Sequence, residues 1–152
     1  MSEVVKFKEA TWLCSSGIAE DGKPFIKRVR TDIQAPVNGL SHESFITIKF
    51  QYPENGLPAD KENAALDNIE EVLLKQLEDL EIGRLVYVQT YDSHRVFLFY
   101  TKEDLSKGHD NIFYAIPEKY NVSLLADLDP EWKFLFEVKN ALEKKLEKRP
   151  GG

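Results

Sequence analysis

Arginine side chains are the clearest candidates for binding chemistry in this sequence. Arg28 and Arg30 alternate along one expected strand, so they share a face, and Arg95 lies on a later strand of the same expected sheet. Guanidinium groups bind carboxylates and phosphates through two parallel hydrogen bonds. The three arginines therefore predict a shallow anion site. The alternative is that they protect an exposed sheet edge or pair with acidic neighbours such as Asp32.

Acidic side chains gather in one segment of the chain, residues 60–81. With eight acidic and two basic residues this segment carries a charge of −6, which equals the net charge of the whole 152-residue chain. On a helix, such a surface is either a solvated face or a docking surface that steers a basic partner. The candidate partner-binding acids are Glu62, Asp67, Glu70, Glu71, Glu78 and Asp79. Direct nucleic-acid binding is not expected, because phosphate contacts need clustered Lys and Arg.

Trp132 is a further candidate for contact with a partner. It follows Asp129-Pro130, where a C-terminal helix is expected to begin. An exposed tryptophan at that position would be a strong interface anchor. The alternative is that its large ring is buried against the sheet.

Catalytic and metal-binding patterns are not recognisable in the sequence. His42, His94 and His109 lie in different expected elements and lack the i, i+4 spacing of a helical metal site. Cys14 is the single cysteine. The run Ser41–Glu43 does not predict a triad, because triads are assembled in space and no Gly-x-Ser-x-Gly elbow is present. We therefore expect no catalytic residues, no metal and no cofactor, and favour a binding protein over an enzyme.

Strands are expected where apolar and polar residues alternate. The dipeptide Asp21-Gly22 suits a tight hairpin turn between the first two strands. The expected strands are Thr11–Ile18, Phe25–Ile33, Ser44–Gln51, Arg84–Tyr91, His94–Thr101 and Tyr120–Asp127.

Three helices are expected between and after these strands. The most regular one begins at a capping Asp60. Its buried stripe has helical spacing and is formed by Leu66, Ile69, Leu73, Leu77 and Leu80. A second helix is expected from Thr101 to just before Pro117, and a third is opened by Asp129-Pro130.

The order of these elements from residue 44 to residue 127 is strand, helix, strand, strand, helix, strand. That order is typical of a ferredoxin-like βαββαβ unit, in which two helices cover one face of an antiparallel sheet. The expected fold class is therefore α+β, with an added N-terminal β-hairpin and a C-terminal helix. We expect residues 1–152 to form a single domain, with a core of about residues 8–147 and a flexible tail at 148–152. No apolar run is long enough for a signal peptide or a membrane span, so a cytoplasmic location is expected.

Several short motifs occur in a characteristic order over about residues 8–140. They are Trp12, Asp21-Gly22-Lys23-Pro24 before Arg28-Val29-Arg30, Asn55-Gly56-Leu57-Pro58, the stretch from Arg95 to Phe99-Tyr100, and Asp129-Pro130-Glu131-Trp132. Together they resemble a bacterial family known as domain of unknown function 695, a resemblance that implies no catalytic residue and no cofactor. Such proteins resemble in turn the regulator of ribonuclease E activity type B, an acidic ferredoxin-like inhibitor. That second resemblance implies a protein-binding regulator.

Three functions follow from these observations. The first is a non-enzymatic protein-binding or regulatory module that uses its sheet or its acidic helix face. The second is a small-anion-binding protein or enzyme built around Arg28, Arg30 and Arg95, which requires these side chains to converge on a concave site. The third is a structural homodimer formed by sheet or helix packing, so either a monomer or a homodimer is compatible with the sequence.

Overall fold

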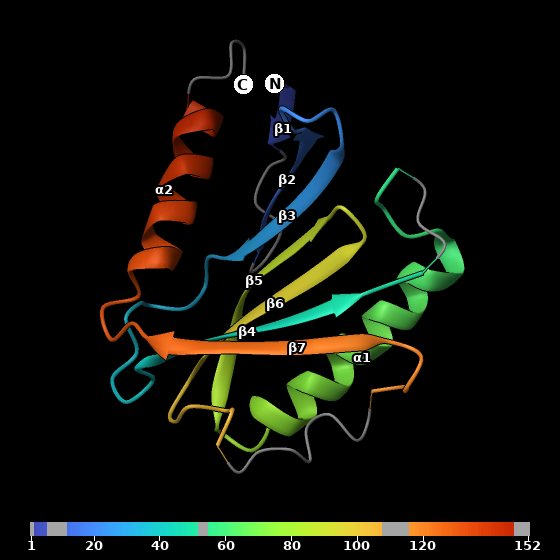
Figure 1. Ribbon diagram of the computed structural model, residues 1–152. Coiled ribbons are helices and arrows are strands. Elements are labelled where there is room, and N and C mark those ends of the chain that lie inside the picture. Colours follow the sequence, from blue (N-terminus) through green and yellow to red (C-terminus); the bar gives the residue numbers. More distant parts are fainter. Residues whose placement is uncertain (1, 6–11, 52–54, 108–115, 148–152) are drawn as a thin grey trace.

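The computed structural model describes residues 2–5, 12–51, 55–107 and 116–147. They form one seven-stranded sheet with a helix packed on each of its faces (Figure 1). The strands are β1 (Ser2–Val5), β2 (Trp12–Ile18), β3 (Pro24–Arg30), β4 (His42–Lys49), β5 (Gly83–Tyr91), β6 (His94–Thr101) and β7 (Asn121–Leu128). The helices are α1 (Asp60–Leu77) and α2 (Lys133–Glu147). The expected α+β class is confirmed.

The strands lie in the order β1-β2-β3-β5-β6-β4-β7, and all neighbours are antiparallel. The expected hairpin of β2 and β3 is present, with Trp12 opposite Arg30 and with Gly22 in the turn at a φ of 85°. Only residues that tolerate a positive φ suit such a turn, which explains the Asp-Gly sequence. The hairpin also carries β1, an additional strand that pairs with β2.

One half of the core lies between α1 and the sheet. Because strand side chains alternate between faces, Ile46 and Ile48 of β4 point to α1 together with Phe97 and Phe99 of β6. The apolar stripe of α1 covers them with Leu66, Ile69, Leu73 and Leu77, which are all buried. This helix therefore gains most of its stability from burial of one face.

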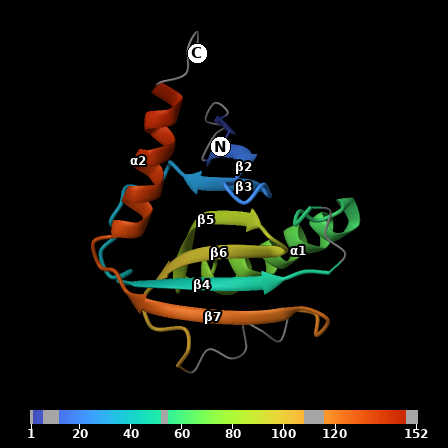
Figure 2. The same ribbon diagram turned by 45° about the horizontal axis from the view of Figure 1, so that its top comes forward.

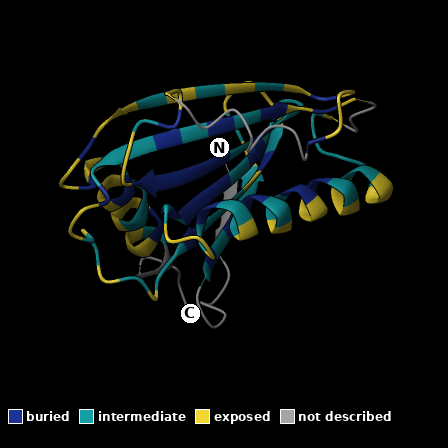
Figure 3. Cartoon of the chain, turned by 90° about the horizontal axis from the view of Figure 1, so that it is seen from below, coloured by how far each residue is buried: buried dark blue, intermediate teal, exposed yellow. Residues whose placement is uncertain are grey.

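The other half of the core lies between α2 and the opposite face. Trp132 is fully buried there and stacks on Tyr100 of β6, with ring centroids 4.2 Å apart. The indole Nε1 donates to the backbone oxygen of Leu40 at 2.8 Å. Figure 3 shows the buried centre of the sheet and the exposed outer sides of the helices. No helix in the described part of the chain combines the length and the apolar character needed to cross a bilayer.

Two expectations about α1 are wrong. Asp60 is its first helical residue rather than its cap, since Ala59 holds the cap position without a side-chain hydrogen bond. Leu80 does not belong to the buried stripe, because the helix ends at Leu77 and the Leu80 side chain is 66% exposed. Glu81 then adopts a left-handed φ of 58°, which turns the chain toward β5.

The expected helix from Thr101 to Pro117 is also wrong at its start. Residues 102–107 form turns, in which the Asp104 carboxylate accepts hydrogen bonds from the Ser106 backbone N–H at 2.9 Å and hydroxyl at 2.6 Å. Such local side-chain bonds compete with helix formation. The rest of this expected helix falls largely on residues 108–115, which lie outside the described ranges.

Several boundaries are shifted by a few residues, including the end of β4, which lies at Lys49 rather than Gln51. The strand expected from Ser44 begins at His42, the strand expected to reach Ile33 ends at Arg30, and α2 begins at Lys133. The late start of α2 has a clear cause. The Asp129 carboxylate accepts hydrogen bonds from the backbone N–H groups of Lys133 at 2.9 Å and Phe134 at 3.2 Å, so the chain loops through Trp132 before the helix forms.

Candidate functional site

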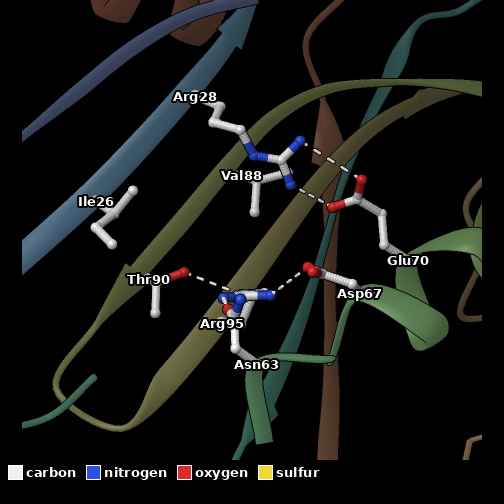
Figure 4. A pocket seen from close by; sticks show the side chains of 8 residues that line it. All are labelled: Ile26, Arg28, Asn63, Asp67, Glu70, Val88, Thr90 and Arg95. Atoms are coloured by element: carbon white, nitrogen blue, oxygen red, sulfur yellow. Dashed lines mark hydrogen bonds and ion pairs between the residues drawn. The ribbon is translucent and has the colours of Figure 1, made fainter. Parts of the chain in front are cut away.

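A polar cleft of about 450 Å³ opens between α1 and the adjacent sheet face (Figure 4). Its lining residues come from β3, β5, β6 and α1 and are Ile26, Arg28, Asn63, Asp67, Glu70, Val88, Thr90 and Arg95. The strand register brings the sheet residues together, because Arg28 lies opposite Val88, Ile26 opposite Thr90, and Thr90 opposite Arg95. Residues that are distant in the sequence thus share one concave surface.

Arg28 forms one wall of this cleft. Its guanidinium group makes a close ion pair with the Glu70 carboxylate of α1, through Nη2 to Oε1, and a second contact of 3.5 Å from Nη1 to Oε2. The same group lies over the ring of Trp12, with its central carbon 4.7 Å from the ring centroid. Arg28 is therefore held between an aromatic face and a carboxylate.

Arg95 forms the floor and is buried. Its Nε donates to the Thr90 hydroxyl at 3.0 Å, its Nη1 to the Asp67 carboxylate at 3.2 Å, and its Nη2 to the Asn63 side-chain oxygen at 2.7 Å. Burial lowers the pKa of Arg95, and the nearby Arg28 charge acts in the same direction, against the carboxylates of Asp67 and Glu70. Two cations, Arg28 and Arg95, thus share the cleft with two carboxylates.

Arg30 is the expected member of the cluster that lies outside the cleft. Its Nε and Nη2 donate to the Asp32 carboxylate at 2.7 and 3.0 Å, which is the pairing that the sequence offered as an alternative. The hydrogen bond to Asp32 raises the pKa of Arg30 despite partial burial. Its Nη1 also contacts the Glu78 carboxylate at 3.5 Å. The structure thus brings Arg28 and Arg95 together and places Arg30 in a separate ion-pair network.

The candidate acidic residues of α1 and of the two positions after it differ in their surroundings. Asp67 and Glu70 face the cleft, and Glu78 is half-buried and accepts a hydrogen bond from the backbone N–H of Leu85 at 2.9 Å. Glu62 is half-buried as well, whereas Glu71 and Asp79 are exposed. The two surfaces predicted separately, the arginine cluster and the acidic helix face, therefore meet. Asn63 belongs to the same site and was missed, although its i, i+4, i+7 spacing with Asp67 and Glu70 signals a common helix face.

Trp132, the remaining candidate for partner contact, is not an accessible anchor. Its side chain has no exposed surface and packs on Tyr100. The alternative prediction, burial against the sheet, describes the structure.

The charged side chains that line the cleft balance one another. Two guanidinium groups face two carboxylates, so the lining has no net charge. A guanidinium group carries five N–H donors. Bonds to described residues use three of these donors on Arg95 and two on Arg28. Guanidinium groups of this kind can donate to an anionic group, and the side chain of Asp67, 60% exposed, can accept from a ligand donor.

The lining of the cleft supplies carboxylate, guanidinium, amide and hydroxyl groups. Among the described residues that line the cleft none is His, Cys or Ser, and the Thr90 hydroxyl is engaged by Arg95. Nor do the described ranges of the chain contain a group of three or more His, Cys, Asp or Glu side chains placed to hold a metal ion.

A second titratable cluster lies on the α2 face and was not predicted. Glu43 of β4 lies opposite Tyr100 on one neighbouring strand and Asp127 on the other. Burial, followed by the charge of Asp129 and a hydrogen bond to it, raises the pKa of Glu43 from 4.5 to about 7. The Tyr100 hydroxyl donates to the Asp129 carboxylate at 2.7 Å. Burial opposes ionisation of Asp129, but this bond and those from Lys133 and Phe134 outweigh it and lower its pKa.

Comparison with known proteins agrees with the motif pattern. No curated protein and no solved structure matches the chain. A family model described as Family of unknown function (DUF695) matches residues 17–138, a range that includes every strand from β3 to β7 and the whole of α1. Because this match spans well over half of the chain, the resemblance seen in the motifs is confirmed, and the chain belongs to the DUF695 family.

Proposed function

We propose that this protein is a binding module whose cleft takes a small polar ligand through a carboxylate or phosphate group. The observation that carries the proposal is the convergence of Arg28 and Arg95 in one cleft. These side chains come from strands that are not neighbours in the sheet, with β5 between them. The concave site that an anion-binding function requires is therefore available.

Preorganisation of the arginines supports this proposal. Arg95 is fixed by three side-chain acceptors, and Arg28 is held on the Trp12 ring, so neither has to be ordered when a ligand binds. Ile26 and Val88 supply apolar wall beside the charged groups. The volume of about 450 Å³ lies in the usual range of small-molecule sites.

Glu70 gives the proposal a sharp test, because its carboxylate occupies the position on Arg28 that a ligand anion would take. Replacing Glu70 by Gln removes a competing negative charge and is expected to raise the affinity for an anion about tenfold. Replacing Arg28 by Gln is expected to lower that affinity by a similar factor. A purely structural ion pair predicts no anion binding in any of these proteins.

The experiment uses inorganic phosphate and a set of small mono- and dicarboxylates, screened by thermal shift and followed by calorimetric titration of the wild type, Glu70→Gln and Arg28→Gln. Arg84→Gln is the matched control, because Arg84 is a half-exposed arginine on the rim of a different cleft. Affinity changes of opposite sign in the two cleft variants support the proposal. Changes of the same sign, or no binding of any probe, refute it.

The outer face of α1 is a second candidate site, for a basic protein partner. It is favoured by the exposure of Glu71 on the helix and of Asp79 just after the helix ends. We infer that β4, α1, β5, β6 and β7 form a ferredoxin-like unit, as in the regulator that members of this family resemble, and that the module acts in the cytoplasm. These inferences support a regulatory role but rest on analogy of fold.

The test of this second candidate is an affinity pull-down from nuclease-treated cytosol at low and high salt. The variant is the pair Glu71→Lys and Asp79→Lys. Glu70 is unsuitable for charge reversal, because its loss disrupts the pair with Arg28. A partner that is retained at low salt by the wild type and lost by the variant supports docking at α1.

A further inference from the structure

The edge strand β7 has an unusual composition for an exposed edge. In the described sheet β7 pairs with β4 on one side, and Figure 2 shows it as the outermost strand. Residues 121–128 contain no Lys, Arg or Pro, and the register with β4 runs without a bulge. Natural proteins usually protect long edge strands with Lys, Pro or a bulge, because an unpaired row of N–H and C=O groups is a template for another strand. The strand β7 has none of these protective features.

Two leucines on this edge are exposed although leucine is usually buried. Leu125 is 71% exposed and Leu128 is 66% exposed. Leu125 belongs to the face that carries α2, since it lies opposite Phe45, whereas Leu128 lies on the opposite face. A partner that continues the sheet would cover both leucines at once, and a ligand on one face would not.

The order of residues in β7 is self-complementary about Leu125. In an antiparallel pair of two β7 strands related by a two-fold axis at Leu125, that residue faces its own copy. Leu128 then faces Val122, and Asp127 faces Ser123, so no like charges oppose each other. A shift of two residues in either direction places Leu125 opposite Ser123 or Asp127 instead.

We propose that β7 pairs with β7 of a second copy of this chain, in antiparallel register centred on Leu125, to give a two-fold symmetric dimer with a continuous sheet. The interface is isologous, so one edge strand supplies both halves of it. Backbone hydrogen bonds extend the sheet, and the leucine contacts on the two faces determine the register. The proposal is independent of the cleft, which lies on β3, β5 and β6.

The first test is the mass of the full-length protein in solution, measured by sedimentation over a range of concentrations. The wild type is expected to reach the mass of two chains. Leu125→Lys places two positive charges across the axis and is expected to weaken dimerisation at least about tenfold. Ser123→Lys is the matched control, because its ammonium group faces Asp127 of the second copy and the dimer is retained. A monomeric wild type, or a dimer that Leu125→Lys leaves intact, overturns the proposal.

The second test reports the register directly. In a Cys14→Ala background, Leu125→Cys places two thiols opposite each other at the axis, within the reach of a disulfide after small adjustment. Mild oxidation is expected to crosslink this variant into dimers. Ser123→Cys, on the same face of the same strand, puts its two thiols far apart and is expected to stay uncrosslinked. Equal crosslinking of both variants would contradict the register.

Discussion

Replacing Glu43 by Gln is expected to stabilise the protein at about pH 8 and to leave its stability nearly unchanged at about pH 4. The pKa of Glu43 is raised from 4.5 to about 7 by burial and by the neighbouring carboxylates of Asp129 and Asp127. Between pH 4.5 and about pH 7, Glu43 keeps a proton in the folded protein that it releases in the unfolded chain. The stability therefore falls as the pH rises from 4.5 to about 7, and the loss is complete above that range.

The size of this effect follows from the width of the pH window. At about 1.4 kcal/mol per pH unit, the interval gives an upper limit of about 3.5 kcal/mol for the loss of stability. Glu43 is half-buried, and solvent screening lowers the expected value to about 1–2 kcal/mol. Glutamine has the same shape and no proton to release, so the variant avoids this loss while its amide can still donate to Asp129.

The assay is urea denaturation at both pH values, followed by fluorescence of the buried Trp132. Glu118→Gln is the control, because Glu118 is an exposed glutamate and its variant should keep the pH dependence of the wild type. The reasoning is refuted if Glu43→Gln is no more stable than the wild type at about pH 8. It is also refuted if the variant changes stability equally at both pH values, since a packing effect would behave in that way.

Three further predictions concern the fold, and each is measured by urea denaturation at neutral pH. Trp132→Ala is expected to cost about 3–5 kcal/mol, because it empties a fully buried site stacked on Tyr100; a loss below about 1 kcal/mol would contradict this packing. Gly83→Ala is expected to cost about 1–3 kcal/mol, because its methyl group would lie 2.8 Å from a backbone oxygen of β6, and an unchanged midpoint would argue against that close approach. Leu73→Ala is expected to cost about 2–5 kcal/mol because Leu73 is fully buried, and Leu80→Ala less than about 0.5 kcal/mol because Leu80 is exposed. Similar losses for the two variants would show that Leu80 is part of the core.

The local patterns of the sequence predict most of the secondary structure. Asp21-Gly22 predicts the first hairpin because few residues other than Gly accept the required φ, here 85° at Gly22. Alternation along the strands and the stripe from Leu66 to Leu77 predict which sides are buried, since both depend on periods of a few residues. The motif order was sufficient to identify the family. The expectation of a helix at Asp104 failed because its side chain binds the Ser106 backbone N–H instead. The expectation that Leu80 is buried failed because the helix ends before it.

The candidate site depends on long-range pairing that no local pattern contains. Arg28 and Arg95 meet because β5 lies between β3 and β6 in a particular register, and Glu70 meets them because α1 packs on that face. The raised pKa of Glu43 has the same kind of origin, since the tertiary structure buries its carboxyl group and the loop before α2 brings Asp129 to it. Charge and hydropathy along the chain indicate which residues are available for pairing. Which of them pair is decided by strand order and helix packing, where the energies of many distant contacts are summed.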